Sequence, residues 1–135
     1  MQKIDIINDN ILIAHVFKHD DKELEWIKFL TPNEYPLQIW IMKYKDWKHV
    51  KAHRHIHMEY KVEITQEFLY VESWKIDIIF YTDSRDKVSE STLESWEFML
   101  SVNWWHEVKI YPWSEIIEVK QWPYPWDANA KIFKN

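Results

Sequence analysis

Short runs in which apolar and polar residues alternate fill most of this chain, and they are rich in isoleucine, valine, phenylalanine and tyrosine. Such runs are typical of β-strands, because β-branched and aromatic side chains pack well on a pleated, half-buried surface. Turn residues separate most of the runs, which favours an all-β sandwich or small barrel over alternating strands and helices. The predicted strands are residues 3–7, 11–17, 37–44, 67–72, 75–82, 97–102, 106–111 and 115–120.

One segment has a helical alternative. Residues 20–29, DDKELEWIKF, carry a weak i, i+3 apolar pattern that leaves open whether they form a short turn of helix. No linker, low-complexity tract or internal repeat divides the chain, and 135 residues fit one domain with one core. We therefore expect a single domain over residues 1–135.

The charge balance and the cysteine count exclude several classes of protein. The formal net charge is −5 with no basic stripe, so we expect neither a nucleic-acid partner nor an anionic membrane surface. No apolar run reaches the length of about 18 residues that spans a membrane. Cysteine is absent, which excludes disulfides and thiol catalysis. The start, MQKIDIINDN, lacks the basic-then-apolar order of a secretory signal, so we expect a cytoplasmic protein.

Two residue counts are abnormal: glycine is absent and tryptophan occurs ten times. Many of the tryptophans stand in turn contexts, where the backbone often needs the positive φ that glycine adopts without steric cost. We interpret tryptophan as occupying positions where a natural parent has glycine. The alternative is a tryptophan-rich binding surface, which would not explain the loss of every glycine. The interpretation predicts positive φ at most of residues 47, 74, 96, 104, 105, 113, 122 and 126.

Histidines concentrate in the middle of the chain. His53, His55 and His57 alternate, so on a straight strand all three imidazoles point to one face. Glu67 opens the next apolar run, and His106 opens a later one after a turn. Imidazole and carboxylate groups from separate strands are a suitable ligand set for a divalent metal ion.

The same residues resemble the two motifs of the cupin family when tryptophan is read as glycine. The first motif is glycine, five residues, His-x-His, a spacer, glutamate, six residues and glycine. Here the chain has Trp47, five residues, His53-Arg54-His55, then Glu67, six residues and Trp74. The second motif begins here as Trp96, five residues, Val102, Asn103 and Trp104, with His106 following. The resemblance covers about residues 37–120.

The chain also departs from the cupin pattern. Eleven residues separate His55 from Glu67, where the family has three or four, and we interpret MEYKVEIT as a longer strand pair before the strand that Glu67 opens. Glu59 has the usual short spacing and is the competing carboxylate, but the six-residue step to Trp74 favours Glu67. In the second motif Val102 replaces a proline, His106 comes one residue early, and Ile110 replaces an asparagine.

The resemblance implies a double-stranded β-helix, a small antiparallel β-barrel, with His53, His55, Glu67 and His106 as metal ligands. The metal is Fe, Mn, Ni, Co or Zn, and its identity is not readable from the ligands. The ending Lys120-Gln121-Trp122-Pro123-Tyr124 resembles that of small bacterial cupins. Lys120, Gln121 and Tyr124 either contact substrate at the barrel mouth or cap the sheet edge. A homodimer is expected. We expect His57 at the surface or near the metal without binding it, and His15, His19 and His49 in solvent.

Three hypotheses for function follow. The first is a metal-dependent cupin enzyme, of isomerase, epimerase or dioxygenase type, that acts on a small polar, sugar-like metabolite. The second is a non-catalytic cupin that binds a metal or ligand, and a closed coordination shell would favour it over the enzyme. The third is that the chain is an engineered or rewritten glycine-free variant of such a cupin.

Overall fold

The computed structural model describes residues 1–20, 27–59 and 61–121, and over this part of the chain the fold is all-β. We find no helix there that is long and apolar enough to cross a membrane. The strands are β1 (Gln2–Asn8), β2 (Ile11–Lys18), β3 (Ile27–Phe29), β4 (Trp40–Met42), β5 (Glu67–Ser73), β6 (Lys75–Tyr81), β7 (Lys87–Glu94), β8 (Phe98–Ser101), β9 (His106–Ile110) and β10 (Glu115–Lys120).

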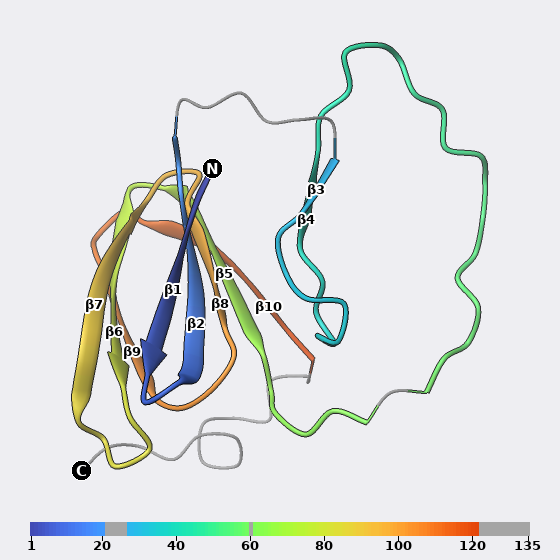
Figure 1. The fold of residues 1–135 in the computed structure, drawn as a ribbon. Coiled ribbons are helices and arrows are strands. Elements are labelled where there is room, and N and C mark those ends of the chain that lie inside the picture. Colours follow the sequence, from blue (N-terminus) through green and yellow to red (C-terminus); the bar gives the residue numbers. More distant parts are fainter. Residues whose placement is uncertain (21–26, 60, 122–135) are drawn as a thin grey trace.

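The strands form antiparallel sheets that are not closed into a barrel (Figure 1). A five-stranded sheet has the order β1-β2-β8-β5-β10, and a three-stranded sheet has the order β7-β6-β9. A separate hairpin pairs β3 with β4. The expected all-β class is therefore confirmed, whereas the finer expectation of a cupin barrel remains a proposal.

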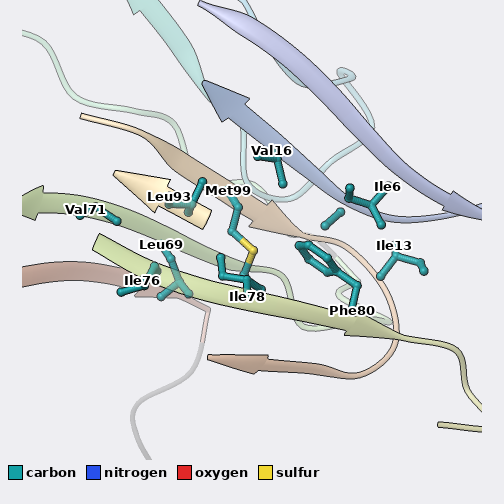
Figure 2. Packing of buried hydrophobic residues seen from close by; sticks show 11 residues of the cluster. Ile6, Ile13, Val16, Leu69, Val71, Ile76, Ile78, Phe80, Leu93 and Met99 are labelled. Carbon is teal, nitrogen blue, oxygen red and sulfur yellow. The ribbon is translucent and has the colours of Figure 1, made fainter. Parts of the chain in front are cut away.

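The main apolar core lies between the two larger sheets (Figure 2). Leu69 and Val71 of β5 alternate with more exposed residues, and Ile76, Ile78 and Phe80 of β6 belong to the same core. Ile79, between the last two, is also buried but is not part of this cluster. Met99 of β8 lies among these side chains and is fully buried. Alternation with a period of two places one face of each strand in this core, which explains why the strands were predictable from sequence.

A second, smaller core covers the other face of the five-stranded sheet. Phe17 and Phe98 stack on that face with ring centroids 4.7 Å apart, and Leu30 packs on them. Ile39 and Ile41 add to this cluster from the chain around β4. The segment from Leu30 to Ile41 therefore lies over the outer face of the sheet.

Four tryptophans have the positive φ predicted for glycine-like positions: Trp74 (65°), Trp96 (73°), Trp104 (61°) and Trp113 (70°). Each lies in a turn that connects one of the two larger sheets to the other. Trp47 and Trp105 do not have positive φ, so the predicted conformation is present at four of the six positions that the structure describes. Residues 122 and 126 lie outside the described part of the chain.

Most of the predicted strands are present, with differences of one or two residues at their ends. The predicted strand over 37–44 shortens to β4, and β7 was not predicted because its sequence KVSESTLE is largely polar. The expected strand pair in MEYKVEIT is wrong for the described residues of that stretch, which form no strand. Within residues 20–29, Ile27–Phe29 is a strand, and residues 21–26 lie outside the described part.

We expect Trp113→Gly to stabilise the protein. The indole of Trp113 is 93% exposed, so its removal costs little packing, and glycine removes the steric cost of a β-carbon at φ 70°. The free energy of unfolding should rise by about 1 kcal/mol, because a left-handed β-carbon costs roughly 1–2 kcal/mol and added chain entropy offsets part of the gain. Denaturant unfolding measures the change.

Trp47→Gly is the matched control, because Trp47 is 85% exposed but does not have positive φ. This variant should show no gain in stability. Equal gains in the two variants would mean that loss of exposed indole area, and not relief of backbone strain, is responsible.

Candidate functional site

Three polar side chains lie where the main core ends. Glu67 begins β5 on the same face as Leu69, and Ser101 ends β8 on the same face as Met99. Glu67 and Ser101 are direct neighbours across the β5–β8 pair. His106 begins β9 in the opposite sheet, two residues before Val108, which packs against the core. The two sheets therefore bring these three residues together at one end of the sandwich.

Glu67 and His106 are in hydrogen-bonding contact. Glu67 Oε1 lies 3.3 Å from His106 Nε2, and Ser101 Oγ lies 3.3 Å from His106 Nδ1. The side chains of Glu67 and His106 are 18% and 21% exposed, so solvent reaches the pair from one side. Ser101 orients the imidazole so that Nε2 faces the carboxylate. The arrangement offers a nitrogen and an oxygen donor side by side, a combination that suits divalent transition metals.

Two of the three expected substrate contacts lie beside this pair. Lys120 is the cross-strand neighbour of Glu67 on β10, and its ammonium group contacts the carboxylate of Glu118. Gln121 Oε1 accepts a hydrogen bond from the backbone N–H of Gln66 at 2.9 Å. Gln121 Nε2 is buried and has no hydrogen-bond partner within the described residues. Tyr124, the third expected contact, lies outside the described residues.

The structure does not bring His53 and His55 to Glu67 and His106. Both histidines are exposed on the chain that follows β4, which runs as a wide loop away from the sheets before it returns to β5 (Figure 1). Their rings contact each other with centroids 5.4 Å apart, and His53 Nδ1 donates to the carbonyl oxygen of Lys51 at 2.9 Å. The competing carboxylate, Glu59, lies 3.9 Å from His57 in solvent.

The expected ligand set is therefore divided between two places. Within residues 1–20, 27–59 and 61–121, no three histidine, aspartate or glutamate side chains converge on a point where a metal ion could be held. Glu67 and His106 form one half of the expected set, and His53 and His55 form the other half. We refer to the Glu67–His106 contact as the half-site.

Comparisons with known proteins add no assignment. No family model, curated protein or solved structure matched this chain.

Two features of the structure were not predicted. Ser101 contacts His106, and its signal was a polar residue in an otherwise apolar strand, FMLSV. The expectation that His15 lies in solvent is wrong, because its side chain is only 2% exposed. It occupies a strand, ILIAHVF, that is buried on both faces. His19 and His49 are exposed, as expected.

Proposed function

We propose that this protein is a metal-binding cupin that acts on or binds a small polar, possibly sugar-like metabolite. The observation that carries the proposal is the contact between Glu67 and His106, two of the four residues that the cupin motifs single out. These residues lie 39 positions apart in the sequence and come from different sheets. The division of the chain into two antiparallel sheets is also compatible with an incompletely closed double-stranded β-helix.

Completion of the site requires the histidine segment to reach the half-site, and the free edge of β9 offers a place for it. β9 pairs with β6 on one side and has no partner strand on the other within the described residues. A strand added there would place its side chains about 4.5–5.5 Å from those of β9. His53 and His55 alternate, so both would then face the half-site and His106.

The proposed chemistry follows from a site with three imidazoles and one carboxylate. Such a set binds Fe, Mn, Ni, Co or Zn and leaves one or two positions for water or substrate. His53, His55, Glu67 and His106 would hold the metal, which would supply Lewis-acid polarisation of a carbonyl group or, in the case of iron, oxygen activation. Lys120 is the cross-strand neighbour of Glu67, and its ammonium group is placed to bind an oxygen atom of a polar metabolite. Gln121 Nε2 is buried and would reach such an atom only after a change of rotamer.

Metal titration of single variants tests the ligand set. Each of His53→Ala, His55→Ala, Glu67→Gln and His106→Ala should weaken Co²⁺ binding by more than about 100-fold, because residues that merely orient a ligand already contribute 10- to 100-fold. Isothermal titration gives the affinities. The d–d absorption of bound Co²⁺ separates an open shell, expected for an enzyme, from a closed four-coordinate shell, expected for a binding protein.

His57→Ala is the matched control, because His57 belongs to the same exposed segment and its partner is Glu59. Its affinity for Co²⁺ should equal that of the parent chain. A loss in His57→Ala as large as in His55→Ala, or retention of binding in Glu67→Gln and His106→Ala, would contradict the assignment of the site.

We also propose a homodimer. β1 is the other edge of the five-stranded sheet, and Ile4, Ile7 and Ile11 in the β1–β2 hairpin are exposed. Apolar side chains at a sheet edge favour pairing with a second copy. Light scattering at working concentration should give twice the chain mass, and a monomer would contradict the proposal. Ile7→Lys should shift the equilibrium to the monomer, because a charged edge residue opposes pairing.

A second candidate is a glycine-free variant of such a cupin, and the φ angles of Trp74, Trp96, Trp104 and Trp113 favour it. Three of these indoles are exposed, so no packing compensates for the backbone conformation. The intact mass of the protein from its natural source tests this candidate directly. A mass of 16.8 kDa means that the natural chain carries tryptophan, and a mass more than a kilodalton lower means that it carries glycine.

A further inference from the structure

A buried histidine outside the proposed metal site links the N-terminal hairpin to the segment that covers the outer face of the five-stranded sheet. His15 Nδ1 lies 2.6 Å from Asp5 Oδ1, its direct cross-strand neighbour on β1. On the other side of the ring, His15 Nε2 lies 3.3 Å from the hydroxyl oxygen of Tyr35, and the two rings stack with centroids 5.8 Å apart. One imidazole therefore joins β1, β2 and the chain between β3 and β4.

The partners determine the protonation of the ring. The carboxylate of Asp5 can only accept, so His15 Nδ1 carries a hydrogen and donates it. His15 Nε2 then accepts the hydroxyl proton of Tyr35. Protonation of the imidazole would reverse this second hydrogen bond, since Nε2 would become a donor and the proton of Tyr35 would need another acceptor.

We propose that the Asp5–His15–Tyr35 contact is a pH-operated clasp that holds the segment from Leu30 to Ile39 on the sheet at neutral pH and releases it on acidification. Among the described residues, the other hydrogen bond that ties this segment to the five-stranded sheet is that from the backbone N–H of Leu37 to Oε1 of Gln66, the residue before β5. Release would expose Phe17 and Phe98, which Leu30 covers.

The charges around His15 give the direction of the pH effect. Lys3 and Asp5 face the imidazole from β1. Glu34 and Tyr35 lie on the segment from Leu30 to Ile39. On β8, the cross-strand neighbour of His15 is the uncharged Leu100. Burial lowers the pKa of His15 below its ordinary value of 6.5, while the hydrogen bond to Asp5 acts in the opposite direction. Above this ordinary value His15 is neutral whether the segment is held or released. As the pH falls below 6.5, His15 binds a proton more readily when the segment is released, because burial no longer lowers its pKa. Acid therefore favours the released state.

Hydrogen exchange of the full chain at pH 8 and pH 5, expressed as protection factors, tests the clasp. Protection of the amides in residues 30–39 should fall by about tenfold at pH 5, the order expected for loss of one hydrogen bond with its packing. Protection of β6 should not change. An equal loss in β6 would mean global unfolding, and no loss in residues 30–39 would mean that no clasp operates. Either result would overturn the proposal.

Two variants assign the effect to His15. His15→Gln keeps a donor and an acceptor but does not titrate, so the difference between pH 8 and pH 5 should disappear. His19→Gln, which changes an exposed histidine on the same part of the chain, should retain it. If His15→Gln does not fold, Tyr35→Phe provides the second measurement, and protection of residues 30–39 should then be low at both pH values. A pH difference that persists in His15→Gln or in Tyr35→Phe would assign it to another group.

Discussion

The sandwich depends on four turns in which the backbone has to adopt a left-handed conformation. Every connection between the two larger sheets, β5 to β6, β7 to β8, β8 to β9 and β9 to β10, contains one residue with positive φ, and each time this residue is tryptophan. A β-carbon in that region costs roughly 1–2 kcal/mol, so the four turns together cost about 4–8 kcal/mol. This sum is comparable with the whole stability of an ordinary domain. Of the four indoles, only that of Trp104 packs against the main core and offsets part of its cost.

The half-site depends on one of these turns. Ser101 and His106 are five positions apart, and they meet because the chain crosses from the five-stranded to the three-stranded sheet between them. The turn is held by the backbone N–H groups of Val102 and Asn103, which both donate to the carbonyl oxygen of Ile13. The backbone N–H of Tyr81 in turn donates to the carbonyl oxygen of Trp105. A change in this turn would therefore move His106 relative to Glu67 without altering either residue.

Much of the strand content was predictable, because strands with one face in the core carry a period-two signal. β7 was not predicted, because its side chains are largely polar and, among them, Leu93 alone is fully buried. The tryptophan φ values were predictable where a turn directly joins two strands, as at Trp74 and Trp113. They were not predictable at Trp47, which lies in the exposed chain after β4 and is subject to no such constraint.

The site was predictable only in part. The proximity of Glu67 and His106 agrees with the motif resemblance, but the position of His53 and His55 depends on contacts between segments far apart in the sequence, which a local pattern does not encode. The Asp5–His15 contact was not predictable either, because it depends on an irregularity in the β1–β2 pairing. Asp9 and Asn10 form the hairpin turn, but regular pairing outward from it would place Asp5 opposite Ala14. A register shift between Ile6 and Ile7 moves the pairing by one residue and places Asp5 opposite His15.

The unpaired edges of the two larger sheets offer places where the exposed chain between β4 and β5 can pack. β9 and β10 each lack a neighbour on one side within the described residues, and an unpaired edge with free backbone groups readily pairs with another strand. Tyr70 and Phe68 of β5 are half-buried under the segment around β4. Their cross-strand neighbours on β10, Ile117 and Val119, are exposed. The apolar face that Ile39 and Ile41 already cover therefore continues onto β10. An extension of β4 across that face would bury Ile117 and Val119 with no new partner, and it would also move the start of the histidine segment toward the sheet edges beside the half-site.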